Sequence, residues 1–323
     1  MTSLKPLEKF VLCVDLGGTQ LRAALCKPVP PMVLRRVSEP TERSSPDAVI
    51  SQMVRMCRTV AEGVPFDQIE AVGIGSPGPL NPNSGVVYEM PNLSGWHDVP
   101  LADRVALELG LRVFLNNDAN VAALGEYRFG AGRGTKDMIY ITVSTGIGGG
   151  IIVDGRLLQG ARGLAAEIGH HTVEAHGVRC KCGNVGCLEA YASGTAIARM
   201  ATEAVYSGSE SLLSGMDAIT AKDVAEAARK GDRLSLEVMH TAGFYLGVGI
   251  VNLLHIFNPS RIILGGSVTK SFDLFRDAMW NTIRERAWAP YLEGFDIVLA
   301  ELGDDVGLMG AMALVLEKID WGV

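Results

Sequence analysis

The sequence predicts an α/β fold made of two similar halves, arranged as two lobes around a cleft. Two observations carry this prediction. A glycine-rich strand–turn–strand pattern occurs twice, about 128 residues apart, and the rest of the chain alternates between short apolar runs and helical segments. The chain has 323 residues, of which 48% are hydrophobic, enough to fill the cores of about two domains.

The repeated pattern is an apolar, β-branched run, then a turn of small residues, then a second apolar run. Such a pattern is typical of a β-hairpin. The two copies are VLCVDLGGTQLRAAL at residues 11–25 and IYITVSTGIGGGIIV at residues 139–153. Because the same hairpin recurs, we expect the two halves to share one topology.

Helical spacing and short apolar runs predict the remaining elements. In the first half they are strands at 33–37, 69–75 and 112–115 and helices at 46–63, 101–109 and 120–129. In the second half they are helices at 196–205, 221–230, 234–257, 271–286 and 306–318 and strands at 261–264 and 297–299. The boundary between the halves is expected near residues 116–118.

Composition argues against several classes of protein. Lys and Arg number 29 against 36 Asp and Glu, a net charge of −7, which argues against nucleic-acid binding. The first ten residues lack the apolar core of a signal peptide. Glu237, His240, Asn252 and His255 interrupt the apolar stretch at 234–257, so we expect a buried helix rather than a membrane span. We therefore expect a cytoplasmic protein with no membrane or nucleic-acid partner.

The two hairpin turns are candidates for binding the phosphates of ATP. Glycine amides approach an anion closely, a threonine hydroxyl adds a donor, and an aspartate holds Mg²⁺. Each turn alone is also explained as an ordinary tight hairpin, whereas the pair, each with a threonine, favours phosphate binding. The candidate residues are Asp15, Gly17, Gly18, Thr19, Thr145 and Gly146.

A further glycine pair, Gly265-Gly266, follows a predicted strand and precedes a predicted helix. It is a candidate adenosine contact, although strand–Gly–Gly–helix turns are common. The chain contains no GxxxxGK[ST] motif, which excludes a P-loop. The hairpin turns join strand to strand, whereas the dinucleotide fingerprint opens a helix.

Polar residues cluster after the predicted strand at 112–115. Four of the five residues from 116 to 120 are polar, and Asp118 stands near the start of a predicted helix. A helix cap explains one polar residue, whereas a pocket that binds a polyol explains four. Phosphorylation of a sugar hydroxyl also needs a base to accept its proton, and Asp118 is the candidate.

Other polar residues, and a loop at a strand end, are candidates for binding the sugar. Carboxylates and amides match the hydrogen-bond donors and acceptors of a polyol better than those of an apolar substrate. The candidates are Ser76, Gly78, Asn92, Asn117, Glu167, His170 and Glu189.

Three of the six cysteines lie within eight positions, and the other three lie in apolar segments as expected for reduced core residues. Without a secretion signal, such a cluster predicts a metal site rather than disulfides. A closed, structural Zn²⁺ site needs a fourth ligand, for which three upstream histidines are candidates. The thiols are Cys180, Cys182 and Cys187, and the histidines are His170, His171 and His176.

These motifs resemble the ROK family (repressor, open reading frame, kinase) of bacterial sugar kinases and regulators, essentially from end to end. The resemblance is carried by VDLGGTQLRAAL, GIGSPGPLNPNSGVV, PNLSGW, NNDANVAALGEYRFGAG, STGIGGGIIVDG, AAEIGHHTV, CKCGNVGCLEAYASG and LGGSV. It implies a duplicated actin-like, hexokinase-type fold related to ribonuclease H. A smaller N-terminal domain would hold residues 1–117 and the last helix, about 306–323, and a larger domain would hold 118–305 with the zinc loop.

The resemblance also implies roles for individual residues. Asp118 would be the base, and His170 would be the fourth zinc ligand, with His171 as the alternative. ATP, Mg²⁺ and a structural Zn²⁺ are the implied cofactors, and a homodimer is the implied assembly. The residues implied at the sugar are Asn92, Asn117, Asp118, Glu167, His170 and Glu189.

Within the family, the sequence is most similar to members that phosphorylate glucose, so the expected reaction is ATP-dependent phosphorylation of glucose at O6. Kinases for N-acetylmannosamine, N-acetylglucosamine, fructose or mannose share nearly all these motifs, and polyphosphate is the alternative donor. A sugar-sensing transcriptional regulator is the remote alternative. Such relatives carry a DNA-binding region ahead of the first glycine turn, and we expect none because Asp15 is only the fifteenth residue.

Overall fold

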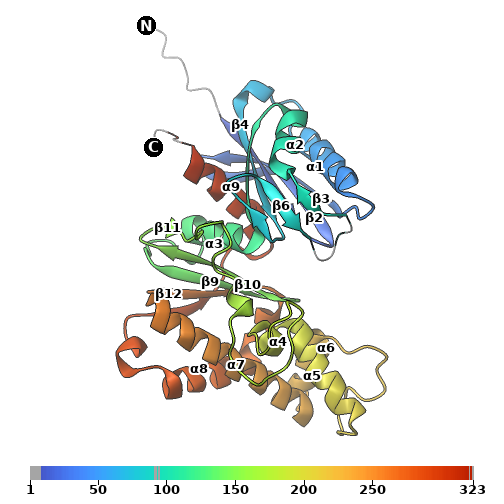
Figure 1. Ribbon diagram of the computed structural model, residues 1–323, viewed down its shortest axis with the longest axis vertical. Coiled ribbons are helices and arrows are strands. Elements are labelled where there is room, and N and C mark those ends of the chain that lie inside the picture. The colour runs from blue at the N-terminus through green and yellow to red at the C-terminus, as the bar shows by residue number, and fades with distance from the viewer. Residues whose placement is uncertain (1–8, 91–92, 94, 320, 322–323) are drawn as a thin grey trace. The chain divides into compact units, whose positions relative to one another are not determined.

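The computed structural model of the protein describes residues 9–90, 93, 95–319 and 321 (Figure 1). The chain divides into two compact units, each built around a five-stranded mixed sheet. The first unit comprises Met1–Arg133, Leu157–Ala165 and Glu301–Val323, and the second comprises Gly134–Arg156 and Ala166–Ala300.

The sheet of the first unit has the strand order β3-β2-β1-β4-β8. The hairpin β1–β2 and the pair β2–β3 are antiparallel, whereas β1, β4 and β8 run parallel. The first predicted hairpin is therefore confirmed. The strands are β1 (Phe10–Leu16), β2 (Gln20–Pro28), β3 (Pro31–Pro40), β4 (Ile69–Ser76) and β8 (Arg112–Asn117).

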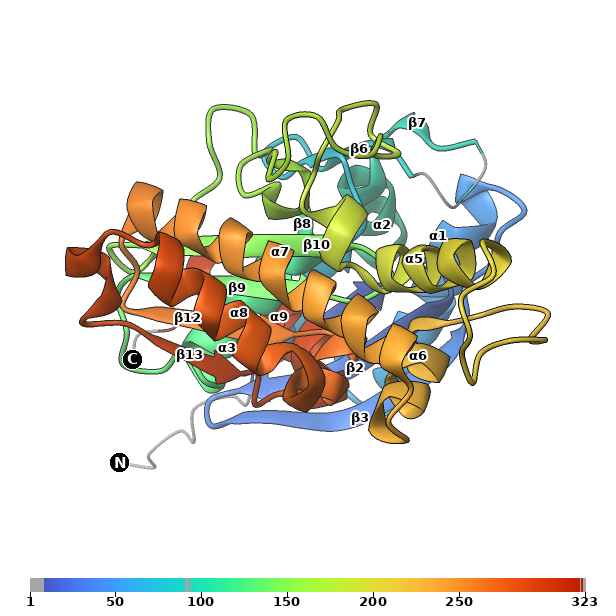
Figure 2. The same cartoon turned by 90° about the horizontal axis from the view of Figure 1, so that it is seen from below.

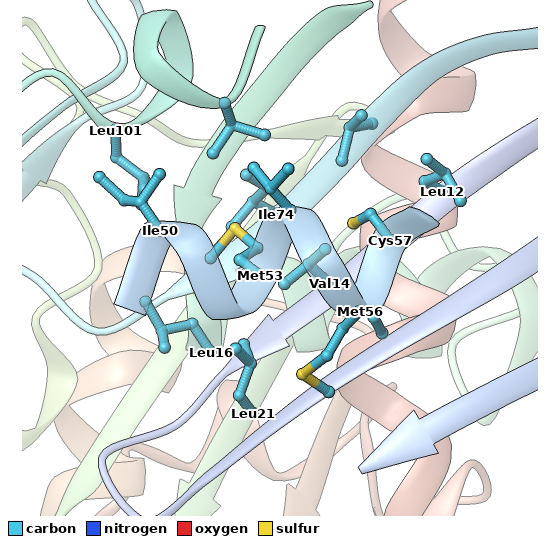
Figure 3. Packing of buried hydrophobic residues seen from close by; sticks show 14 of the residues in the cluster. Leu12, Val14, Leu16, Leu21, Ile50, Met53, Met56, Cys57, Ile74 and Leu101 are labelled. Carbon is cyan, nitrogen blue, oxygen red and sulfur yellow. The ribbon is translucent and has the colours of Figure 1, made fainter. Parts of the chain in front are cut away.

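Helices α1 (Pro46–Val60) and α2 (Leu101–Leu109) contribute to the core on one face of this sheet. Figure 3 shows Met53 and Met56 of α1 packed against Val14 of β1 and Leu21 of β2. Alternate residues of β1 meet this core, and Val11 and Cys13 between them are also buried. Such burial on both faces explains why the sequence of this strand is a nearly continuous apolar run without alternation.

The helices α3 (Asp118–Phe129) and α9 (Val306–Lys318) pack against each other, and α9 also packs on β1 and β4. The two helices meet backbone to backbone, because a Cβ on Gly125 would lie 2.9 Å from the amide nitrogen of Gly310 and a Cβ on Gly310 would overlap the carbonyl of Val121. This contact fixes the axis of α3, whose first residue is Asp118.

A small antiparallel sheet, β5-β6-β7, also belongs to the first unit. The sequence did not predict it, since its strands are two to four residues long and show no clear periodicity. They are β5 (Leu80–Asn81), β6 (Val86–Glu89) and β7 (His97–Val99).

The sheet of the second unit has the order β11-β10-β9-β12-β13. The hairpin β9–β10 is antiparallel, and β9, β12 and β13 run parallel, as in the first unit. The prediction of two halves with one topology is confirmed. The strands are β9 (Met138–Val143), β10 (Ile147–Val153), β11 (Arg156–Leu157), β12 (Arg261–Gly265) and β13 (Asp296–Leu299).

Helices α7 and α8 run side by side over one face of this second sheet (Figures 1 and 2). By length and composition, α7 is the one described helix that could cross a membrane, but 56% of its apolar window is buried, as in the core helix of a soluble protein. It packs against the other four helices of its unit. The helices are α4 (Glu189–Ala192), α5 (Gly194–Tyr206), α6 (Ala221–Arg229), α7 (Arg233–Phe257) and α8 (Phe272–Arg286).

The division into units differs from the boundary expected between residues 117 and 118. Helix α3 belongs to the first unit because it packs on α9, and the second unit begins at Gly134. The two units are also nearly equal in length, rather than a smaller first and a larger second domain. The last helix, α9, lies in the first unit.

Glu126 ties the end of α3 to the segment that leads into α9. Its fully buried carboxylate accepts hydrogen bonds from three backbone amides, those of Ala131 (2.8 Å), Leu302 (2.9 Å) and Glu301 (3.2 Å). A buried amide without a partner costs about 1–3 kcal/mol. We therefore expect Glu126→Ala to lower the free energy of unfolding by about 3–5 kcal/mol, measured by urea denaturation.

Glu108→Ala is the matched control, because Glu108 is an exposed glutamate of the same unit. We expect it to change the stability by less than about 0.5 kcal/mol. Equal stability of the two variants would show that the hydrogen bonds of Glu126 contribute little.

Candidate active site and metal centre

In the first unit, the polar candidates gather where three neighbouring parallel strands end. The register pairs Asp15 of β1 with Gly75 of β4, and Ser76 of β4 with Asn117 of β8. Carboxyl ends of parallel strands are where α/β sheets bind ligands. Asp15, Ser76 and Asn117 therefore share one edge of the sheet with Asp118, the next residue of the chain.

Asp118 is exposed at the first position of α3, and it is not the helix cap. The cap is Asn117, whose side-chain oxygen accepts the amide of Ala119 at 3.0 Å. Asp118 Oδ1 also accepts this amide, at 2.8 Å. The explanation of Asp118 as the capping residue is therefore wrong, and its carboxylate lies exposed at the N-terminus of α3.

A buried pair of amides supports this turn from beneath. Asn116 and Asn120 are 1% and 2% exposed, and Asn120 Nδ2 donates to Asn116 Oδ1 at 3.2 Å. The same oxygen accepts the backbone amide of Asn117 at 2.8 Å. Buried hydrogen bonds of this kind fix the backbone on both sides of Asp118.

Asp15 lies opposite Arg22 in the β1–β2 hairpin, with 3.7 Å between its Oδ2 and the guanidinium. Burial raises the pKa of the Asp15 carboxyl, and Arg22 partly offsets this. The carboxylate lies at the start of α9, where a Cβ on Gly307 would overlap it. Arg22 was not among the sequence candidates, although the hairpin register places it on the same side of the sheet as Asp15.

The first glycine turn has its carbonyls bound and two successive amides available. Thr41 Oγ1 donates to the carbonyl of Gly17 (2.7 Å), Arg43 to that of Gly18 (2.8 Å), and the Thr41 amide to that of Thr19 (3.0 Å). Among the described residues, no acceptor is bonded to the amides of Gly18 and Thr19. Successive free amides form a site for an anion.

The second glycine turn lies beside the pair that follows β12. The strand register pairs Gly265 with Thr142 of β9, and Ser144 Oγ lies 3.0 Å from Ser267 Oγ. The two turns therefore lie side by side in the second unit, in contact through Ser144 and Ser267. That Thr145, Gly146, Gly265 and Gly266 belong to one site stays a prediction.

Glu167 and Glu189, the two candidate sugar-binding carboxylates of the second unit, lie next to tightly turned backbone. Glu167 is exposed at the centre of an inverse γ-turn, with φ −70° and ψ 59°, closed by the bond from the Ile168 amide to the Ala166 carbonyl at 2.7 Å. Glu189 begins α4, and its Oε2 accepts the amide of Ile147 at 2.9 Å.

The predicted metal ligands converge. The ligand atoms of His170, Cys180, Cys182 and Cys187 all lie within 4.8 Å of one another. His170 Nδ1 is 3.8 Å from Cys180 Sγ, and Cys182 Sγ is 3.6 Å from Cys187 Sγ. Zinc bonds of about 2.0–2.3 Å place tetrahedral ligand atoms about 3.5–3.8 Å apart. The donor set and its spacing therefore fit a closed Zn²⁺ site.

The alternative ligand His171 is directed away from the thiols. Its Nδ1 lies 2.6 Å from the carbonyl of Ile168, and its ring faces Gly249 of α7. Burial lowers the pKa of His171. His170 is thus the histidine that the structure brings to the cysteines, and His171 is half-buried beside Gly249 of α7.

The sequence candidates are distributed over both units. Ser76, Gly78, Asn117 and Asp118 lie in the first unit, where a Cβ on Gly78 would approach Asn117 Nδ2 to 3.3 Å. Glu167, His170 and Glu189 lie in the second. Asn92 lies outside the described residues.

A duplicated α/β fold with a glycine turn at each sheet edge and an aspartate at a strand end is that of the actin-like, hexokinase-type sugar kinases. The sequence profile of the ROK family matches residues 11–318. The chain belongs to the ROK family.

The chain is 36% identical over 312 residues to a glucokinase of Thermotoga maritima, covering 95% of this chain and 97% of that one. It is also similar to the crystal structure of a Streptomyces griseus ROK glucokinase in complex with glucose and AMPPNP (36% identity, TM-score 0.78, 94% and 98% coverage). A ROK family transcriptional regulator, a homologue of an E. coli protein, is similar as well (29% identity, TM-score 0.86, 95% and 78% coverage).

Proposed function

We propose that the protein is a glucokinase, which transfers the γ-phosphoryl group of ATP to O6 of glucose. The observation that carries this proposal is the position of Asp118, an exposed carboxylate at a strand end whose capping role is taken by Asn117. Similarity to glucokinases over nearly the whole chain supports the choice of substrate.

In the proposed reaction, Asp118 accepts the proton of the C6 hydroxyl as O6 attacks the γ-phosphorus. The bond from O6 to phosphorus forms, and the bond to the β,γ-bridging oxygen breaks with its electron pair leaving on ADP. The free amides of Gly18 and Thr19, and those of Thr145 and Gly146, bind phosphate oxygens. Mg²⁺, when bound, neutralises phosphate charge, and Asp15 is the residue proposed to hold it through water.

The sugar is proposed to be bound by carboxylates and amides that match its hydroxyl groups. Glu167 and Glu189 accept hydrogen bonds from hydroxyls, and Asn117 offers both a donor and an acceptor. His170 presents one ring nitrogen to the metal cluster, which leaves the other for the sugar. The proposed set is Ser76, Gly78, Asn92, Asn117, Asp118, Glu167, His170 and Glu189.

The four-residue cluster is proposed to hold a structural Zn²⁺. Two short bridges, Thr172 to Cys187 and Arg179 to Val185, shape the loop between His170 and Glu189. A bound ion fixes this loop and with it the two sugar ligands at its ends.

Replacement of the base tests the mechanism. We expect Asp118→Asn to lower kcat at least about a thousandfold, because the amide cannot accept the proton. Glucose binding and thermal stability should stay near those of the wild type, since Asn117 caps the helix. A coupled assay of ADP release and calorimetry with glucose measure the two effects.

Asp103→Asn is the matched control, an exposed aspartate in the first turn of α2 in the same unit. It removes the same charge and should retain full activity. Near wild-type turnover in Asp118→Asn would remove Asp118 from the role of base.

Metal analysis tests the zinc site. We expect about one equivalent of zinc per chain in the wild type, close to none in Cys187→Ser, and a lower melting temperature in that variant. Cys57→Ser removes a buried thiol of the first unit and should keep its zinc. Less than about half an equivalent in unchelated wild type would contradict the proposal.

The substrate is tested by ADP release with glucose, mannose, fructose, N-acetylglucosamine and N-acetylmannosamine. Preference for one of the other sugars would leave the proposed kinase activity standing and change its substrate.

The similarity to a transcriptional regulator gives a second candidate function, DNA binding, which a gel-shift assay without and with glucose tests. A cytoplasmic location, a homodimer and the lack of a nucleic-acid partner remain predictions.

A further inference from the structure

The segment that follows the metal cluster is bonded to the second glycine turn. The Ile147 amide donates to Glu189 Oε2 (2.9 Å), the Gly194 amide to the Ser144 carbonyl (2.7 Å), and Thr195 Oγ1 to the Thr145 carbonyl (2.8 Å). All these residues belong to the second unit. Residues 189–195 thus hold the turn from its first residue to its last.

These bonds leave the proposed phosphate donors free. They use the carbonyls of Ser144 and Thr145 and the amide of Ile147, while within the described residues the amides of Thr145 and Gly146 have no acceptor. The arrangement repeats that of the first turn, where Thr41 and Arg43 bind the carbonyls. In both turns, side chains and neighbouring backbone stabilise the conformation that presents two successive amides.

The Glu189 carboxylate lies very close to the backbone of the turn at Gly146. The backbone of Gly146 does not have the positive φ that requires glycine, but a Cβ there would overlap the Glu189 carboxylate. Glycine at this position is therefore explained by the carboxylate beside it. Any side chain at 146 would displace either the turn or Glu189.

Glu189 has two oxygens with different surroundings. Oε2 accepts the Ile147 amide, and in the described part of the chain no hydrogen bond involves Oε1. The side chain is half-buried. One carboxylate can therefore bind a ligand hydroxyl through one oxygen while it holds the turn through the other.

We propose that Glu189 is a positioning residue for the nucleotide as well as a sugar ligand, and that through it the binding of hexose and of ATP is coupled. A hydroxyl bound to Oε1 restrains the carboxylate, which restrains the turn, so the second ligand meets a turn already ordered. Coupling of this kind is reciprocal, and each ligand raises the affinity for the other by the same factor. The inference rests on the proposed function of the second turn as a phosphate site.

A purely electrostatic role of Glu189 predicts the opposite effect on nucleotide binding, so the experiment can distinguish the two roles. A carboxylate near a phosphate repels it, so a residue that acted only by its charge would weaken nucleotide binding, and its removal would strengthen it. A residue that bound only the sugar would leave nucleotide binding unchanged when no sugar is present. A positioning residue, when removed, weakens nucleotide binding without sugar.

The experiment measures the dissociation constant of Mg·AMPPNP by calorimetry in the absence of sugar. We expect Glu189→Ala to bind about tenfold more weakly than the wild type, and Glu189→Gln to recover most of the affinity because its amide oxygen still accepts the Ile147 amide. Glu167→Ala is the matched control, because Glu167 is also a proposed sugar ligand but has no hydrogen bond to the turn. It should bind AMPPNP like the wild type.

Thr195→Val keeps the proposal testable if Glu189→Ala does not fold. It removes only the hydroxyl bond to the Thr145 carbonyl and should weaken AMPPNP binding several-fold. Wild-type or tighter binding in Glu189→Ala, or in Thr195→Val where Glu189→Ala does not fold, would overturn the inference and leave the kinase intact. No AMPPNP binding by the wild type would overturn the proposed function together with the inference.

Discussion

The hydrogen-bond register of three parallel strands is the constraint from which the candidate site follows. Because β1, β4 and β8 are aligned at their carboxyl ends, Asp15, Ser76 and Asn117 meet at one edge although about a hundred residues separate the first from the last. A shift of one residue in any strand would turn its terminal side chain to the other face. Such a shift would also disrupt the close packing of the core, since residues 10–14 of β1 are all buried.

The two glycine turns follow the same physical principle with different partners. Each is a hairpin whose carbonyls are occupied by neighbouring groups, so that adjacent amides remain available. In the first unit the partners come from the loop after β3, and in the second from the junction of α4 and α5. The repetition of fold topology extends to this local arrangement, whereas the residues that provide it have no common sequence pattern.

The sequence predicted the hairpins, the long helices and the metal cluster, because periodicity and cysteine spacing depend on neighbours in the chain. It did not predict that Asn117 rather than Asp118 caps α3, since both residue types cap equally well. It also missed Thr195, whose hydroxyl meets a turn fifty positions earlier in the chain. The boundary at residue 117 differed because the packing of α3 on α9 is a contact between distant segments.

The helix cap and the proposed base are two different residues, Asn117 and Asp118, and this has a consequence for the evolution of the protein. Asn117 caps the helix, and an oxygen at position 118 accepts the Ala119 amide whether or not it belongs to a carboxylate. We therefore expect a chain with asparagine at position 118 to fold with the proposed sugar ligands in place. Phosphoryl transfer can thus be lost without loss of the fold. One substitution at position 118 would then separate an enzyme from a protein that only binds its ligand.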